Sequence, residues 1–412
     1  MNHKFLLCLA ILAFPLSSYG MSTTFFKPAT IIPKIRFAND AFFTINPLYA
    51  HSSTTNSIDG NGQKTYLLNW NGPETLLNSY VDKSLPNSDI TSAGKAYLDA
   101  KSITNEFGLI ITKNIPKGFF FEIQLYIKQL RLKNLRLVPL NSKNEPFESR
   151  ENIVSEDPTF AQYLDDFETL YFLPSVEHND TETKMFIQNY TFLNSFIFAG
   201  YTHTWNHFSH IDFVDFTCKL GLALDFVNKK ESHQILQLPL NTNNGFCAEL
   251  STAIGVLNWI NIGTNFSTKI FTGTEQTVGL NTNSVDNDFL KPYHNQATVK
   301  PGPFFYGSIY VEADHIEGGL SMLFGYSFAR QQRTKIETTS SEFAPHLNSE
   351  QSRYQGWSLG TLLFEIEYDF ATEKFKNVPA LKFSLFQPVH GRRVFKAATQ
   401  VTSCCLQFSH KF

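Results

Sequence analysis

The stretch Phe119–Lys128, FFFEIQLYIK, decides the fold class of this chain. Apolar and polar side chains alternate along it. One face carries Phe119, Phe121, Ile123, Leu125 and Ile127, and the other carries Glu122, Gln124, Tyr126 and Lys128. Because successive side chains of a strand point to opposite faces, the stretch predicts a strand of about ten residues with one apolar face.

The same alternation recurs along most of the chain. The polar faces hold Gly, Ser, Asn and isolated charges. We predict twelve strands, with approximate spans 41–51, 103–113, 118–131, 186–200, 211–226, 245–257, 260–272, 303–313, 318–331, 356–370, 379–387 and 397–412. The first, fourth and eighth alternate poorly. A hairpin hidden in the first or second long connection would make fourteen.

Two architectures are built from repeated alternating strands. A soluble sandwich buries the apolar faces between two sheets, whereas a membrane barrel turns them toward lipid. Strands of about 9–11 residues match a tilted crossing of a bilayer. Short connections alternate with long ones near 53–102, 134–185, 274–302 and 334–352, which is the habit of outer-membrane barrels. We therefore expect an all-β, antiparallel, up-and-down transmembrane barrel, with the sandwich as the alternative.

The composition agrees with this expectation. The 412 residues include 40 Phe, and only 17% are charged. So much apolar and aromatic surface excludes a disordered chain. A net charge of −3 argues against a general nucleic-acid binder.

The first twenty residues, MNHKFLLCLAILAFPLSSYG, predict a secretory signal peptide. Lys4 supplies the positive region, Phe5 to Leu16 form the apolar region, and Ser18 and Gly20 are the small residues before the cleavage point. Residues 21–412 would then form the barrel and its loops. The remaining cysteines, Cys218, Cys247, Cys404 and Cys405, are expected to be free thiols.

The last strand carries a family resemblance. Cys404, Leu406, Phe408 and the terminal Phe412 share one face, and Ser403, Cys405, Gln407, Ser409 and Lys411 share the other. This pattern resembles the C-terminal assembly signal of Gram-negative outer-membrane β-barrels, although His410 stands where that pattern usually has an aromatic or apolar residue. The resemblance implies location in a bacterial outer membrane, contact with its lipid, and assembly by the barrel-assembly machinery through Leu406, Phe408 and Phe412.

The second long connection predicts a helix over about 158–172. Asp157 and Pro158 suit the N-cap and first helical position. Phe160, Leu164, Phe167 and Tyr171 follow at helical spacing. The helix is either a lid or constriction in the lumen, or a surface helix packed on neighbouring loops.

The alternation also predicts which charged side chains face the lumen. The acids are Glu106, Glu122, Asp225, Glu249, Glu365, Glu367 and Asp369, and the bases are Lys128, Lys219, Lys269, Lys382 and Lys411. This excess of acids suggests weak cation preference if the pore is open. Opposite charges could instead pair and close it, because twelve strands lie between filled and water-filled barrels.

Two local motifs have competing interpretations. Gly356–Gly360 matches the hydrolase pattern G-x-S-x-G, but that motif needs a strand, a sharp turn and a helix. Here it runs into an alternating strand, so Ser358 is expected to be a chance match. His203, His207 and His210 surround Trp205, and we expect interfacial side chains there rather than a metal site.

We therefore expect a porin-like barrel for passive diffusion of small polar solutes, with no catalytic residue and no cofactor. The inward-facing charges would tune its selectivity: Glu365, Glu367, Asp369, Lys219, Asp225, Lys269, Lys382, Glu122, Lys128 and Glu249. The alternatives are an outer-membrane lipase-type enzyme that uses Ser358, and a closed structural or adhesive barrel that acts through its loops.

Overall fold

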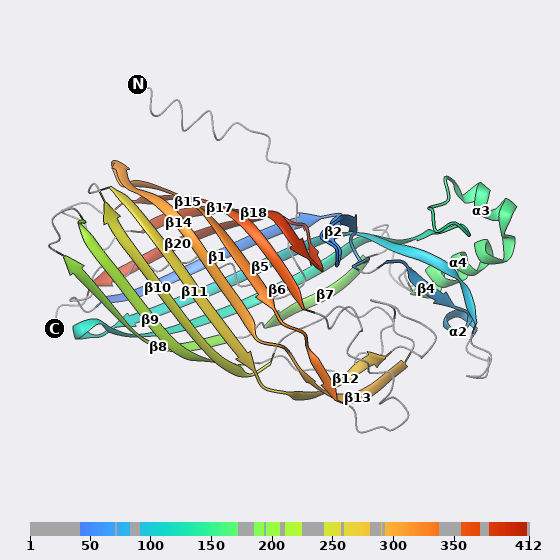
Figure 1. Cartoon of the computed structure of the whole chain (residues 1–412), viewed down its shortest axis with the longest axis horizontal. Coiled ribbons are helices and arrows are strands. Elements are labelled where there is room, and N and C mark those ends of the chain that lie inside the picture. Colours follow the sequence, from blue (N-terminus) through green and yellow to red (C-terminus); the bar gives the residue numbers. More distant parts are fainter. Residues whose placement is uncertain are drawn as a thin grey trace.

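Twelve antiparallel strands form a closed barrel in the computed structural model (Figure 1). The structure describes residues 42–70, 72–82, 91–171, 185–192, 195–206, 211–224, 243–256, 259–280, 290, 293–337, 356–370 and 379–409. The barrel strands are β1 (Phe42–Thr54), β5 (Ser92–Asn114), β6 (Phe119–Pro139), β8 (Ser195–Asn206), β9 (Phe213–Leu224), β10 (Gly245–Val256), β11 (Ile260–Phe271), β14 (Phe304–Glu317), β15 (Leu320–Gln331), β17 (Trp357–Asp369), β18 (Ala380–Arg392) and β20 (Thr399–Ser409).

Each barrel strand pairs with its neighbours along the chain, and β1 pairs with β20 to close the ring. The predicted count of twelve is confirmed, and the sandwich alternative is wrong. The predicted fourth strand is two segments, β7 (Met185–Phe192) and β8, which both pair with β6. A closed ring satisfies the backbone groups of every strand and leaves no open edge in lipid.

The outer face of the ring is apolar. Phe121, Leu220, Phe246, Ile309 and Phe324 are exposed there, and their neighbours in sequence point inward and are buried or half-buried. A soluble sandwich would bury these apolar side chains between its sheets, whereas in a membrane barrel they face lipid. Among the described residues, no helix is both long and apolar enough to cross a bilayer.

Short connections lie at one end of the barrel and long ones at the other. At the short end, η2 (Pro116–Gly118) joins β5 to β6, and Phe42 of β1 pairs with Ser409 of β20. Gly118 has φ +85°, and a Cβ atom there would lie 2.1 Å from the carbonyl oxygen of Thr202. The turn therefore requires glycine.

The long connections build an extension beyond the ring, visible at the right of Figure 1. Its elements are β2 (Asn56–Ile58), β3 (Lys64–Tyr66), β4 (Glu74–Leu77), α2 (Asn78–Val81), α3 (Arg150–Glu156), α4 (Pro158–Tyr171), β12 (Thr274–Leu280), β13 (Tyr293–Lys300), β16 (Lys335–Glu337) and β19 (Val394–Phe395). Strands β5 and β6 run out of the barrel to support β4 and the helices.

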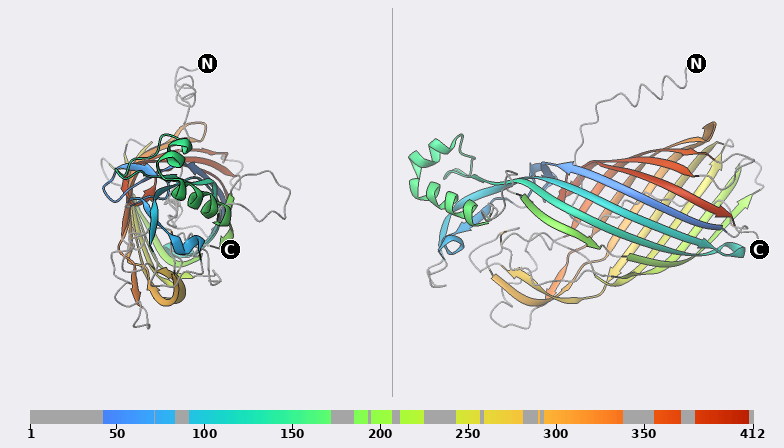
Figure 2. Two further views of the ribbon diagram at one scale, coloured as in Figure 1. Left: turned by 90° about the vertical axis from the view of Figure 1, so that its right-hand side faces the viewer. Right: turned by 180° about the vertical axis from the view of Figure 1, so that it is seen from behind.

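The predicted helix starts where its sequence indicates. The side chain of Asp157 accepts the backbone N–H of Phe160 at 2.9 Å, and Pro158 is the first helical residue. Phe160, Leu164 and Phe167 are buried. The tyrosine hydroxyl of Tyr163 donates to the carbonyl of Leu77 at 2.7 Å. Helix α4 thus packs on neighbouring loops beyond the barrel, and the alternative of a helix inside the lumen is wrong (Figure 2).

Candidate functional site: the lumen and its closed mouth

The candidate site is the interior of the barrel, because its wall carries buried charged and polar side chains. Lys219 of β9 lies on the inner face, where its ammonium group is 2.8 Å from Glu122 of β6 and 2.7 Å from Glu249 of β10. The ammonium group also lies 4.8 Å from the ring centroid of Phe198. One lysine therefore links carboxylates from two strands, in a water-poor environment where each charge needs a partner.

A second ion-pair group lies on β17 and β18. The ammonium group of Lys382 is 2.6 Å from Glu365 and 3.1 Å from Glu367. The hydroxyl of Ser384 donates to Glu365 at 2.8 Å. Strand register explains the arrangement, because Glu367 is directly opposite Lys382 and Glu365 is opposite Ser384.

Two more of the predicted lysines lie inside the barrel. Lys269 of β11 has its ammonium group 4.1 Å from the ring centroid of Phe196, which is a favourable cation–π distance. Lys128 is opposite Glu106 across β5 and β6, and both side chains are buried. Asp369 also lies on the inner face, near the short-turn end of β17. Asp225 and Lys411 lie outside the described residues.

The structure adds acids that the sequence analysis omitted. Glu312 accepts a hydrogen bond from the amide of Asn261 at 3.1 Å, and Asp314 accepts one from the hydroxyl of Ser321 at 2.9 Å. Asp215 lies on the same inner parity as Lys219. Strand β14 alternates poorly in sequence, but the even positions from Tyr306 onward already share a face with Glu312 and Asp314. That parity could have identified both.

The middle of the lumen is apolar rather than uniformly polar. Its buried cluster draws one or two side chains from nearly every wall strand: Leu48, Ala50, Ile110, Tyr126, Phe196, Phe198, Ala223, Cys247, Tyr310, Leu323, Leu363, Phe386 and Val401. The expectation of a polar interior is therefore correct only for part of the wall. Apolar constrictions of this kind can close a pore by excluding water.

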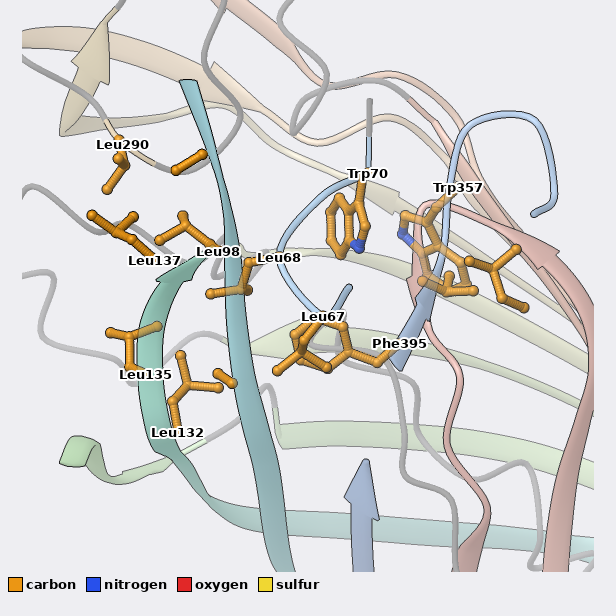
Figure 3. Packing of buried hydrophobic residues seen from close by; sticks show 14 of the residues in the cluster. Leu67, Leu68, Trp70, Leu98, Leu132, Leu135, Leu137, Leu290, Trp357 and Phe395 are labelled. Atoms are coloured by element: carbon orange, nitrogen blue, oxygen red, sulfur yellow. The ribbon is translucent and has the colours of Figure 1, made fainter. Parts of the chain in front are cut away.

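The first external connection carries large apolar side chains at the long-loop end of the barrel. Leu67, Leu68 and Trp70, called the plug below, are buried. Figure 3 shows Leu67 and Leu68 between one group of side chains that includes Leu98 and Leu132 and another that includes Trp357 and Phe395. The ring of Trp70 lies 6.1 Å from that of Phe395.

The buried cluster around the plug draws side chains from the extension and from several wall strands. It contains Leu98 on β5 and both Phe304 and Tyr306 on β14. Strand β14 is six places from β5 in a ring of twelve, so the two strands face each other across the lumen. The plug therefore belongs to one buried cluster that joins the extension to side chains of the wall strands β14 and β17.

The remaining predicted motifs lie away from the lumen. Ser358 is on the outward parity of β17, within a continuous strand, so the strand–turn–helix geometry of the hydrolase motif is not formed. The ring of His203 stacks on that of Tyr201, with 6.2 Å between the ring centroids, and its centroid lies 4.6 Å from that of Trp205. This aromatic group lies near the short-turn end. His207 and His210 lie outside the described residues. No group of three metal-ligating side chains occurs in the part that the structure describes.

The C-terminal strand pairs as predicted. β20 lies between β18 and β1, with Leu406 opposite Ile45. The backbone of Phe408 belongs to this strand, and Phe412 lies outside the described residues. The four cysteines Cys218, Cys247, Cys404 and Cys405 are free thiols, as predicted.

No protein-family model matches the sequence, and no curated protein matches it. Solved structures do match its fold. An outer membrane channel from Pseudomonas putida F1 has a TM-score of 0.49 at 9% identity, covering 90% of this chain and 96% of that one. The Ralstonia pickettii toluene transporter TbuX has a TM-score of 0.32 at 9% identity, covering 90% of each chain. Salmonella typhi OmpF has a TM-score of 0.27 at 9% identity, covering 90% and 98%. On its own geometry, a closed ring with an apolar outer face, this chain is a β-barrel of the outer-membrane type.

Proposed function

We propose that the chain is an outer-membrane channel for small polar solutes that is closed at rest by its own first external loop. The observation that carries this proposal is the buried apolar cluster that joins the plug to side chains of the wall strands, among them Phe304 and Trp357. A barrel that served only as an anchor would not need paired charges deep inside it. Those charges would give a polar solute binding groups once the plug moves.

The inner wall supports a preference for cations. Acidic residues outnumber basic ones among the inward-facing positions of the described strands: Glu106, Glu122, Asp215, Glu249, Glu312, Asp314, Glu365, Glu367 and Asp369 against Lys128, Lys219, Lys269 and Lys382. Rings of acidic side chains favour cations in pores. The predicted lumen acids and lysines would thus tune selectivity.

Delivery to the membrane follows the expectation from sequence. The leader 1–20 would direct export, and the C-terminal residues Leu406, Phe408 and Phe412 would engage the barrel-assembly machinery. Both assignments are part of the proposal.

Liposome swelling tests the permeant class. Vesicles that contain the chain are placed in solutions of L-arabinose, a small neutral sugar, or stachyose, a tetrasaccharide. The variant Leu67→Ser/Leu68→Ser/Trp70→Ser should admit arabinose much faster than the unaltered chain, and stachyose slowly if at all. The matched control is Val278→Ser/Val299→Ser, which loosens β12 and β13 in a buried cluster separate from that of the plug. Equal and negligible arabinose influx for all three proteins would contradict the proposal.

The external extension favours one second candidate, a closed barrel that acts through its loops. The extension buries Phe160 and Leu164 of α4 and exposes Val154 and Leu170 on its helices. In that case the plug variant would not conduct, and removal of residues 141–171 would abolish binding to whatever surface the loops recognise. The swelling experiment separates the two candidates.

A further inference from the structure

The outward face of the β5–β6 hairpin changes from apolar to polar with distance from the short-turn end. Toward the short-turn end it presents Leu109 and Leu125, which are paired across the two strands. Further along, Phe107 is exposed and its ring lies 5.0 Å from that of Tyr49 on β1. The hydroxyl of Tyr49 donates to the side-chain oxygen of Asn105 at 2.9 Å. Tyrosine with its ring in lipid and its hydroxyl on a polar group marks the edge of the apolar layer.

Three basic residues lie just beyond that edge, on the same face. Lys101 of β5 is directly opposite Lys133 of β6, and Arg131 is two residues closer to the membrane, opposite Ile103. The side chain of Lys101 is exposed, and those of Arg131 and Lys133 are half-buried. We call these three residues the basic trio. Like charges placed directly opposite each other in a sheet repel.

No protein group in the described residues neutralises the trio. Asp99, an acid on this face of β5, is held by Arg136, whose two nitrogens lie 2.7 and 3.1 Å from the same carboxylate oxygen. The buried Nε of Arg131 has no hydrogen-bond partner in the described part of the chain. Within the described residues, the trio therefore presents donors without an acidic partner, just beyond the tyrosine at the edge of the apolar face.

We propose that Lys101, Arg131 and Lys133 bind the phosphate of an anionic lipid in the outer leaflet. A phosphate accepts several charge-assisted hydrogen bonds at once and would relieve the repulsion between the two lysines. We assign a lipid as the occupant because the apolar face directly below the trio would hold its acyl chains. The proposal rests on the outer-membrane location proposed above, but not on conduction.

The test measures binding of diphosphoryl lipid A to the full chain in non-ionic detergent micelles, by native mass spectrometry. The variant Lys101→Gln/Arg131→Gln/Lys133→Gln should bind roughly a hundredfold more weakly, given the contribution of each basic residue at an anionic surface. The control Lys64→Gln/Lys143→Gln/Lys335→Gln removes the same charge from exposed positions in the external connections. It should bind within about threefold of the unaltered chain.

Three results would overturn the proposal: equal weakening by both triple variants, no weakening by the first, or inorganic phosphate binding the trio as tightly as lipid A does. Heat-modifiable gel migration checks that each variant is folded. If the triple variant does not fold, Lys101→Gln alone, at an exposed position, should still weaken lipid A binding about fivefold. Because binding in micelles does not depend on an open pore, a failure here leaves the channel proposal standing.

Discussion

At the scale of single residues, the buried charges show what sequence alternation can and cannot predict. The alternation placed Glu122 and Lys219 on the inner face, and the structure confirms that face. It could not predict that they pair, because they are 97 residues apart and meet only through the order of β6, β8 and β9 in the ring. The glycine at position 200 lies opposite Lys219 on β8, and the ring of Phe120 fills the space beside it.

Removing Lys219 should cost more than removing an exposed partner of the same type. Lys219→Met leaves Glu122, whose side chain is 1% exposed, without its ammonium partner. We expect the free energy of unfolding to fall by about 3–5 kcal/mol, measured by urea unfolding in lipid vesicles. The control is Arg136→Met, whose side chain is 63% exposed in its pair with Asp99. Its effect should stay within about 1 kcal/mol, and equal effects would show that burial is not the cause.

At the scale of elements, helix α4 shows which features follow from nearby residues and which depend on distant strands. Its start was predictable because Asp157 and Pro158 act within one turn. Its docking site was not, because it lies on parts of β5 and β6 beyond the predicted ends at 103 and 131. The alternation is interrupted there by irregularities near Asp99 and Lys128 and by the positive φ of Asn134. Such interruptions hide the continuation of a strand from a period-two search.

Leu164→Ala should loosen the extension while leaving the barrel intact. Leu164 lies on the buried face of α4 and is fully buried. Its truncation should therefore weaken the packing of α4 on the rest of the extension by about 3 kcal/mol. We expect faster proteolysis within residues 141–171 and unchanged heat-modifiable migration of the barrel. Leu170→Ala is the control, because that side chain is 57% exposed. Cleavage at the same rate in both variants would show that α4 is not held by its apolar face.

At the scale of the whole molecule, the inner wall should select cations once the mouth is open. In the plug variant, the reversal potential in a KCl gradient should show a cation preference. Adding Glu312→Gln and Asp314→Asn should reduce that preference, because both carboxylates face the lumen. Adding Glu337→Gln, an exposed position on β16, should leave it unchanged. An anion preference in the plug variant would contradict the assignment.

The sequence predicted the ring but not the burial of the plug. Strand number, outward faces and the alternation of connection lengths follow from period-two patterns that each strand carries locally. The plug does not, because Leu67, Leu68 and Trp70 lie in a connection without periodicity and become buried only by meeting residues such as Phe304 and Trp357 from distant strands. The apolar layer inside the lumen was missed in part because the strands near 41–51 and 186–200 alternate poorly.

The most direct test of the account is single-channel recording in a planar bilayer, comparing residues 21–412 with the same chain carrying Leu67→Ser, Leu68→Ser and Trp70→Ser. The account predicts rare openings for the unaltered chain and frequent, discrete conductance steps for the variant, because only the variant lacks the large apolar side chains of the plug. Stable insertion of both proteins with no conductance from either would contradict the claim that this barrel is a channel closed by its own loop.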